Sequence, residues 1–219
     1  MKSPLPNLVV IAVLLLASSF CPCVAAADWG PLSRAQALEQ AKSGQIDKRR
    51  LAYGRLAEVG TPDDVPVLLA ALWDDEELIR GMAEQAVWGI WMRTDDPTAD
   101  PMFQTGIQLL TEDEPAQALV KFSQVIALKP EFAEAWNRRG DAYQFMGEEE
   151  RALAEYEHVL RLNPYHFGTL ESCGQIWLER SNYRKAAEYF RRALEINPNL
   201  WNVAEILQRL EKSLENDRI

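Results

Sequence analysis

Residues 134–164 read EAWNRRGDAYQFMGEEERALAEYEHVLRLNP, and the same pattern recurs before and after this stretch with a period of 34 residues. Each copy carries a glycine, an alanine, an aromatic residue and a proline at fixed distances from one another. These residues are Gly106, Ala118, Phe122 and Pro130 in the first copy, Gly140, Ala152, Tyr156 and Pro164 in the second, and Gly174, Ala186, Phe190 and Pro198 in the third. A constant period of this length predicts a stack of similar structural units.

Each unit is predicted to be a pair of α-helices. The glycine and the alanine would lie on facing helices where the two backbones cross closely, and the aromatic ring would fill the space beside them. The proline would end the second helix, because it cannot continue one. One pair alone leaves an apolar face uncovered, so stacked pairs should share a continuous core. We therefore expect an all-α, helical-repeat solenoid.

These copies resemble the tetratricopeptide repeat (TPR) family, whose pattern runs Trp-x-x-Leu-Gly-x-x-Tyr and then Ala, Phe, Ala and Pro. The middle copy matches best, through Trp136, Gly140, Tyr143, Ala152, Tyr156 and Pro164. The chain departs from the pattern at the first leucine, which is Thr105, Arg139 or Cys173. The resemblance implies a right-handed solenoid that binds protein, with units at residues 99–132, 133–166 and 167–200. A capping helix with a tail frayed from Ser213 should occupy residues 201–219.

Residues 28–94 are predicted to form a second, smaller helical segment. The pattern Arg49-Arg50-Leu51-Ala52, followed by Leu56, recurs as Arg80-Gly81-Met82-Ala83, followed by Val87. Between these copies, Thr61, Pro62 and Asp64 have the order of a capped helix start. The segment resembles a HEAT-type repeat, which implies that Arg49 and Arg80 each pair with an acidic residue of a neighbouring turn.

The join between the two segments is short. Residues 95–98 form the predicted linker, within a stretch rich in proline and aspartate that breaks the helix but leaves little freedom of movement. Trp88 and Trp91 lie close together near the end of the preceding helix. Large aromatic residues at this spacing are more often buried than exposed, so we expect them in the core of the junction.

The first residues predict export. Lys2 precedes an apolar run from Leu8 to Phe20, and small residues follow at positions 25–27. This order is typical of a cleavable signal peptide over residues 1–27, and the periplasm is the expected compartment. An uncleaved membrane anchor over residues 8–27 is the alternative, and lipid attachment at Cys21 is a weaker one. Cleavage would leave Cys173 alone, so no intramolecular disulfide is expected.

Composition and motifs argue against several classes of function. The formal net charge of −10 disfavours nucleic acid or an anionic membrane as a partner. His158 and His166 have no cysteine or suitably spaced acid beside them, so no metal site is predicted. The sequence shows no nucleophile triad and no glycine-rich phosphate loop, so we expect neither an enzyme nor a cofactor.

The TPR resemblance places a partner-binding groove on the first helices of the units. Its contact positions correspond to Phe103, Ile107, Leu110, Glu134, Asn137, Asp141, Gln144, Glu171, Gln175 and Leu178. This groove would be apolar at one end and rich in acids and amides at the other, which suits a partner segment with basic and apolar residues. TPR domains that clamp the acidic tails of cytosolic chaperones need basic residues where Glu134 and Asp141 stand here.

Three hypotheses follow. The first is an exported, non-enzymatic adaptor that holds a segment of another protein, for example within an envelope assembly complex. The second is a structural subunit that associates with itself, and a membrane-anchored form of the adaptor is a variant of the first. An enzyme is the third and least favoured.

Overall fold

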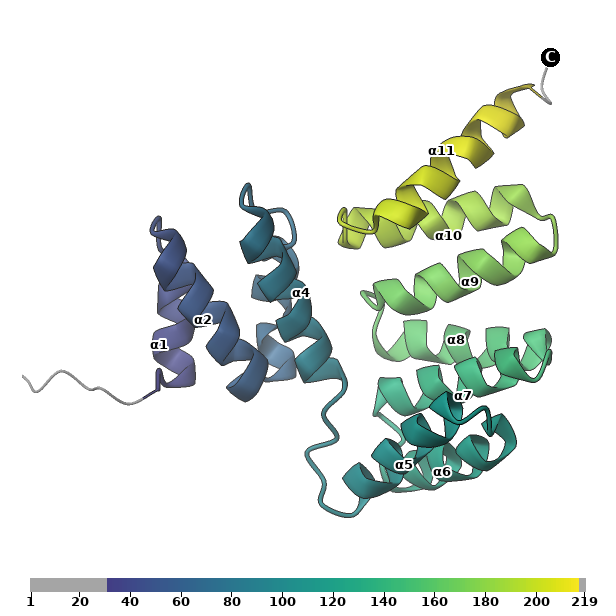
Figure 1. The fold of residues 1–219 in the computed structure, drawn as a ribbon, viewed down its shortest axis with the longest axis horizontal. Coiled ribbons are helices and arrows are strands. Elements are labelled where there is room, and N and C mark those ends of the chain that lie inside the picture. The colour runs from purple at the N-terminus through teal and green to yellow at the C-terminus, as the bar shows by residue number, and fades with distance from the viewer. Residues whose placement is uncertain (1–30, 217–219) are drawn as a thin grey trace, which may run out of the picture. The chain divides into compact units, whose positions relative to one another are not determined.

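The computed structural model describes residues 31–216, and all regular structure in that range is helical (Figure 1). The expected signal peptide, residues 1–27, lies outside the described residues, as do residues 217–219. The elements are α1 (Arg34–Gln40), α2 (Ile46–Val59), the 3₁₀-helix η1 (Pro62–Asp64), α3 (Val65–Ala71), α4 (Glu77–Trp91), α5 (Ala99–Thr111), α6 (Pro115–Leu128), α7 (Ala133–Phe145), α8 (Glu149–Leu162), α9 (Phe167–Glu179), α10 (Tyr183–Ile196) and α11 (Trp201–Asn216).

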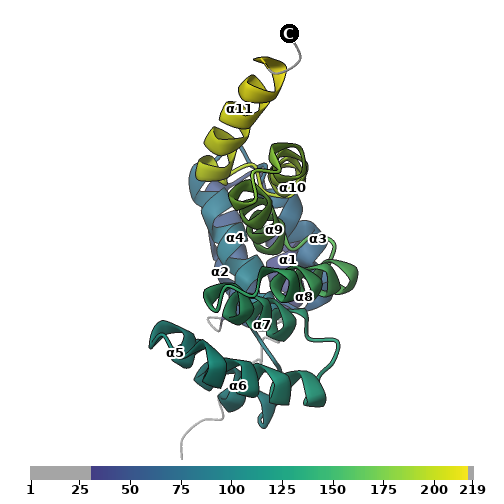
Figure 2. The ribbon, with the colours of Figure 1, turned by 90° about the vertical axis from the view of Figure 1, so that its right-hand side faces the viewer.

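The repeats, residues 99–200, consist of the helix pairs α5/α6, α7/α8 and α9/α10, which stack in chain order (Figure 2). The first helices begin at Ala99, Ala133 and Phe167, and α11 begins at Trp201. Each start follows the previous one by one full period of the sequence pattern. The predicted unit boundaries therefore coincide with the starts of these helices.

Each second helix ends shortly before a proline, at Leu128, Leu162 and Ile196. The residue directly before the proline has left the helical conformation, with φ of −136° at Lys129 and −138° at Asn163. A proline ring clashes with the backbone of a preceding helical residue, so it forces this change. The prediction that the prolines end the second helices is confirmed.

The repeated glycines lie against the repeated aromatic rings. A Cβ atom placed on Gly140 would lie 2.5 Å from the ring of Tyr156, closer than real Cβ contacts allow. The equivalent distances are 2.6 Å between Gly106 and Phe122 and 2.4 Å between Gly174 and Phe190. The prediction that the aromatic ring of the second helix fills the space beside the glycine is confirmed.

The turn inside each helix pair contains one residue in the left-handed region. Its φ is 59° at Asp113, 73° at Gly147 and 57° at Ser181, and these three positions are equivalent in the repeat register. Glycine adopts this conformation without strain, whereas a residue with a Cβ atom is less favourable there. The middle unit alone has glycine at this position of the three turns.

The N-terminal segment, helices α1 to α4, has a core of its own. Its buried side chains include Leu56, Leu68, Ile79 and Val87. The helix start predicted at Thr61 is confirmed, because η1 begins at Pro62 and the Asp64 carboxylate accepts the Thr61 N–H at 2.8 Å.

Arg34 ties α1 to the start of α3. Its guanidinium donates to both carboxylate oxygens of Asp64, at 2.6 and 2.7 Å. Burial raises the pKa of Asp64, but the bonds from Arg34 and Thr61 outweigh burial, and the pKa lies below its usual range.

The two repeated arginines of the N-terminal segment differ in their partners. Arg49 forms the expected ion pair, with Asp74 at 3.1 Å. Arg80 instead donates to the backbone oxygens of Asp74 and Asp75 and to the side-chain oxygen of Asn199. The expected pairing of Arg80 with an acid is therefore wrong, because an amide from the repeats lies within reach of its guanidinium.

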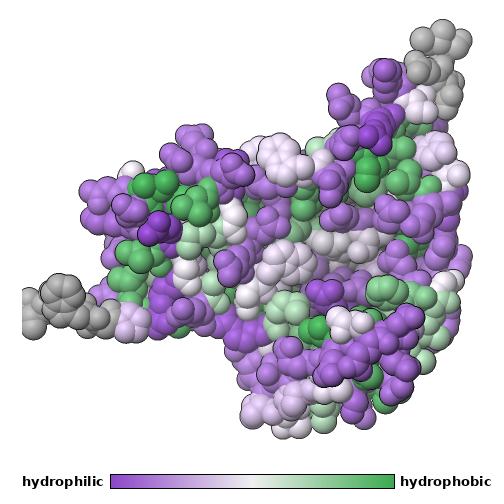
Figure 3. All heavy atoms as spheres, in the orientation of Figure 1, coloured by the Kyte–Doolittle hydropathy of each residue, from purple (hydrophilic) through white to green (hydrophobic). Residues whose placement is uncertain are grey.

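The last helix, α11, continues through Asn216, so the expected fraying from Ser213 is wrong for the described residues. Val203, Leu207 and Leu210 are buried against α10, and Leu214 extends this contact by another turn. On the face shown in Figure 3, the side of α11 turned to solvent is largely hydrophilic. No helix within residues 31–216 is both long enough and apolar enough to cross a bilayer.

Candidate partner-binding groove

The N-terminal segment contacts the repeats through aromatic side chains of α4. The Trp91 ring stacks on His166, with 4.7 Å between the ring centroids. The Trp88 ring meets Phe167 edge-on at 5.3 Å, and a Cβ atom on Gly168 would lie 2.8 Å from Trp88. The prediction that both tryptophans belong to the core of the junction is confirmed.

A second set of contacts joins the two segments near the start of α11. The Asn199 amide donates to the backbone oxygen of Leu72 at 2.9 Å and accepts a bond from Arg80 at 2.7 Å. Ile196 and Leu200 pack against the N-terminal core as well. Residues from Leu32 onward accordingly form one compact unit.

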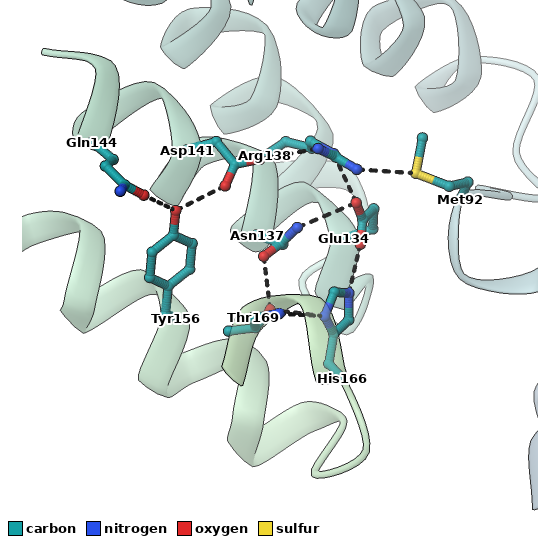
Figure 4. A network of polar contacts seen from close by, with 9 residues as sticks. All are labelled: Met92, Glu134, Asn137, Arg138, Asp141, Gln144, Tyr156, His166 and Thr169. Carbon is teal, nitrogen blue, oxygen red and sulfur yellow. Dashed lines mark hydrogen bonds and ion pairs between the residues drawn. The ribbon is translucent and has the colours of Figure 1, made fainter. Parts of the chain in front are cut away.

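Glu134 and His166 form the centre of a buried polar network (Figure 4). His166 Nε2 lies 2.8 Å from one carboxylate oxygen of Glu134, and both side chains are 0% exposed. The other carboxylate oxygen accepts from the Asn137 amide at 3.3 Å and forms an ion pair with Arg138, whose Nε lies 2.8 Å away. Burial raises the pKa of Glu134, but His166 and Arg138 outweigh burial, so the pKa is lowered and the carboxylate is favoured.

Thr169 fixes the orientation of the histidine. Its backbone N–H donates to His166 Nδ1 at 3.1 Å, which leaves the hydrogen on Nε2 to point at Glu134. The Thr169 hydroxyl donates to the Asn137 oxygen at 2.7 Å. The network therefore connects the first turns of α7 and α9.

Asp141 extends the polar contacts along α7. It accepts from Arg138 at 3.1 Å and from the Tyr156 hydroxyl at 2.8 Å, and the Gln144 oxygen lies 3.0 Å from that hydroxyl. Burial raises the pKa of Asp141, and Arg138 offsets this only in part. Burial and the nearby Asp141 raise the pKa of Tyr156. These contacts hold α7 against α8.

Three of the ten predicted groove residues are buried. Phe103 is in the core, where its ring meets Phe122 and Phe132 edge-on. Glu134 and Asn137 are 1% and 5% exposed, because they are enclosed in the network with His166 and Thr169 at the start of α9. We correct the prediction for these three, which are not open to a partner in this structure. The partly exposed seven are Ile107, Leu110, Asp141, Gln144, Glu171, Gln175 and Leu178.

The open part of the groove lies at the C-terminal ends of the first helices. A hollow of about 550 Å³ is lined by Arg138, Asp141, Gln144, Phe145 and Glu179. Phe145 is 67% exposed, which is unusual for a phenylalanine. Arg138 is already engaged by Glu134 and Asp141.

Sequence reasoning missed Phe145 and Glu179. The two residues occupy equivalent places in the repeat and are the last residues of α7 and α9. The predicted contact positions stopped short of this place in both helices. The repeat register could have indicated this position, because it is the last helical residue before the turn in both α7 and α9.

A pair of acids lies between α4 and α9. Burial raises the pKa of Glu171 on α9, and the charge of Glu84 on α4 raises it further. Facing carboxylates disfavour each other's ionised form, so a cation would be favoured beside them.

A second hollow, of about 370 Å³, lies between the N-terminal segment and the turns that precede α7 and α9. Its lining includes Pro62, Trp91, Phe132, Tyr165 and His166. This lining is mostly apolar, and its buried polar groups belong to the Glu134–His166 network.

The described residues offer little for metal or thiol chemistry. Among residues 31–216, no group of three or more His, Cys, Asp or Glu side chains is placed to hold a metal ion. Cys173 is buried inside α9, and burial raises the pKa of its thiol to about 12. A thiol with so high a pKa stays protonated at neutral pH and is a poor nucleophile.

Stacked helix pairs of constant period, an acidic hollow and an exposed phenylalanine define a helical-repeat protein. Two family models, each described as tetratricopeptide repeat, match residues 133–166 and 169–200. These two stretches of the chain are therefore tetratricopeptide repeats. The resemblance of residues 28–94 to HEAT repeats stays a prediction.

Relatives match parts of the chain. A TPR repeat-containing protein of Rhizobium etli is 30% identical over 128 residues, which cover 58% of this chain and 63% of that protein. Human Superkiller complex protein 3 is 38% identical over 82 residues, which cover 36% of this chain and 5% of that protein. The chain thus spans less than two thirds of either relative.

Solved structures share the fold. One is the first TPR of Spaghetti (RPAP3) bound to the HSP90 peptide SRMEEVD, which is 16% identical with a TM-score of 0.50. The match covers 53% of this chain and 93% of the Spaghetti chain. The Sgt2 TPR domain from Aspergillus fumigatus is 18% identical, with a TM-score of 0.51. The match covers 56% of this chain and 83% of that domain.

Proposed function

We propose that this protein is a non-enzymatic scaffold that binds a segment of another protein in the open part of its repeat groove. The observation that carries the proposal is Phe145, an exposed aromatic side chain at the edge of a hollow of about 550 Å³. Exposed aromatic residues beside polar groups are typical of protein-binding surfaces, because they bury a large area at a small entropic cost. The TPR family supports the same assignment.

The partner segment should carry both basic and apolar residues. Asp141 and Glu179 line the hollow, and the arginine beside them is already paired. A lysine or arginine of the partner would balance these carboxylates, while a leucine or aromatic residue would cover Phe145. The peptide bound to Spaghetti, SRMEEVD, is acidic at its end. We propose the opposite preference for this groove.

The protein is further proposed to act outside the cytoplasm. Lys2, the apolar run from Leu8 to Phe20 and the small residues at positions 25–27 support a cleaved signal peptide and a periplasmic location. A role within an envelope assembly complex would suit an exported adaptor. Cell fractionation with N-terminal sequencing tests this: a mature chain that starts near Asp28 supports cleavage, whereas an intact chain in the membrane fraction supports the anchored form.

Labelled peptides test the groove directly. Two short peptides of equal length would share the same leucine positions, one with lysines and the other with glutamates between them. We expect the lysine peptide to bind the full chain more tightly in fluorescence anisotropy, and added salt should weaken it. The double variant Phe145→Ser/Glu179→Lys should lose about tenfold or more of that affinity.

A matched control lies on the second helices. Val120 and Glu157 are also exposed, so Val120→Ser/Glu157→Lys makes the same kind of changes away from the hollow. This variant should bind like the parent. Equal binding of both peptides, or equal loss in both double variants, would refute the groove assignment.

A further inference from the structure

Helix α4 has two faces with different neighbours. One face belongs to the N-terminal core and consists of the buried residues Ile79, Ala83, Ala86, Val87 and Ile90. The other face carries Arg80, Trp88 and Trp91, which contact Asn199, Phe167 and His166 of the repeats. The spacing of these three residues, i, i+8 and i+11, aligns them along one side of a helix.

The second face of α4 binds the repeats as a separate helical ligand would. In this type of recognition an amphipathic helix places side chains one or two turns apart into a groove. The side chains at the end of α4 and just after it, Trp91 and Met92, lie over His166 and Arg138. His166 directly precedes α9 and Arg138 lies on α7, so these contacts cover part of the network that joins the two helices.

We propose that α4 is an intramolecular ligand of the repeat groove and that its release opens the first turns of α7 and α9 to a partner. The inference concerns regulation of the groove proposed above and rests on that function. In the closed form the hollows open beside the first helices are the one at Phe145 and Glu179 and the smaller one at Trp91 and His166. In the open form a partner would also reach the faces of the His166 and Phe167 rings that Trp91 and Trp88 now cover.

The polar network allows α4 to leave without a large electrostatic penalty. The polar contacts of Glu134 are with His166, Arg138 and Asn137, all of which belong to the repeats. Release therefore leaves no buried charge without a partner, which would otherwise be strongly unfavourable. What the network loses is the stacking of Trp91 on His166 and one weak hydrogen bond, from Arg138 to the Met92 sulfur at 3.7 Å.

The linker shows where the two segments would separate. Arg93 is bound to the N-terminal segment through the backbone oxygens of Glu58 and Gly60. The next residue, Thr94, is bound to the repeats, because Lys129 donates to its backbone oxygen and its hydroxyl lies 3.2 Å from Asp100. The chain thus passes from one segment to the other between two adjacent residues.

A peptide that copies the second face of α4 tests the proposal. The probe spans residues 77–92, with Ile79→Gln, Val87→Gln and Ile90→Gln to remove the core-facing side, and carries a fluorophore. We expect it to bind the full-length variant Trp88→Ala/Trp91→Ala at least about tenfold more tightly than the parent, whose own α4 occupies the site. A control peptide that also has Trp88→Ala and Trp91→Ala should bind neither protein.

Two results would overturn the proposal: equal affinity of the probe for parent and variant, or no binding to either. If the double tryptophan variant loses its helical circular dichroism, Arg80→Ala/Asn199→Ala replaces it, because this pair joins the segments outside both cores. Failure of the lysine peptide to bind would refute the proposed partner chemistry alone, since the probe reports on a different part of the groove.

Discussion

His166 Nε2, directly before α9, lies 2.8 Å from a carboxylate oxygen of Glu134 in the first turn of α7, and neither side chain reaches solvent. This bond joins the first turns of the middle and last repeat units. It gives the stack a specific register in addition to its apolar packing.

Glu134→Gln should destabilise the fold by about 3 kcal/mol at pH 7, because it removes the buried charge that pairs with Arg138. The pKa of Glu134 is lowered in the fold. The carboxylate therefore stabilises the protein above the ordinary glutamate pKa of about 4.3, and this contribution is lost as the pH falls through the lowered pKa. Urea unfolding from neutral to acidic pH should show the two proteins converging at low pH. The exposed neighbour provides the control, since Glu131→Gln should change little at any pH.

Gly140→Ala should cost about 1 to 3 kcal/mol, because the new Cβ atom would lie 2.5 Å from the Tyr156 ring and would force that ring to move. Gly81→Ala is the matched control. Gly81 lies in α4 with nothing within 4 Å of its Cβ position, so the change should stabilise the protein by about 0.5 to 1 kcal/mol. Thermal melts of both variants test this. A Gly140→Ala protein that melts at or above the parent would contradict the close glycine–ring contact.

Ser181→Gly should stabilise the protein by up to about 1 kcal/mol, since glycine adopts the φ of 57° without strain. Gly147→Ala should have the opposite effect at the equivalent turn, where φ is 73°. The pair compares the same backbone position in two units. If chemical denaturation gave both changes the same sign, the left-handed turn would not be the cause.

Asn199→Ala should cost about 1 to 2 kcal/mol, because Arg80 and the Leu72 carbonyl would both lose a partner. Asn202 lies exposed on α11 and provides the control. Amide hydrogen exchange should rise at the loop before α4 and at the start of α11 in the Asn199 variant, and in neither place in Asn202→Ala. Unchanged exchange in both would mean that this bond does not hold the segments together.

The repeat units could be predicted in detail because their determinants lie close together in sequence. Pro164 ends a helix through its effect on Asn163, and Gly140 faces the ring of Tyr156, which lies on the very next helix. These short-range relationships recur in all three units, so each unit independently indicates the same repeat register. The same argument applies to the helix start at Thr61 and Pro62.

The junction could not be predicted in the same way. The spacing of Trp88 and Trp91 showed that they should be buried, but their neighbours His166 and Phe167 lie much further along the chain, where the third repeat unit begins. Which repeat faces α4 depends on the path of the linker. Glu134 and Asn137 were predicted as open groove residues and are in fact buried, because His166 and Thr169 from the start of the next helix pair bond to them.

Cys173 supplies a native reporter for the last repeat unit. Its thiol is buried and protonated at neutral pH, so an alkylating reagent should modify it only when α9 separates from its neighbours. After brief exposure to iodoacetamide, mass spectrometry of the fragment that contains Cys173 would therefore measure how often this unit opens in the chain without substitutions.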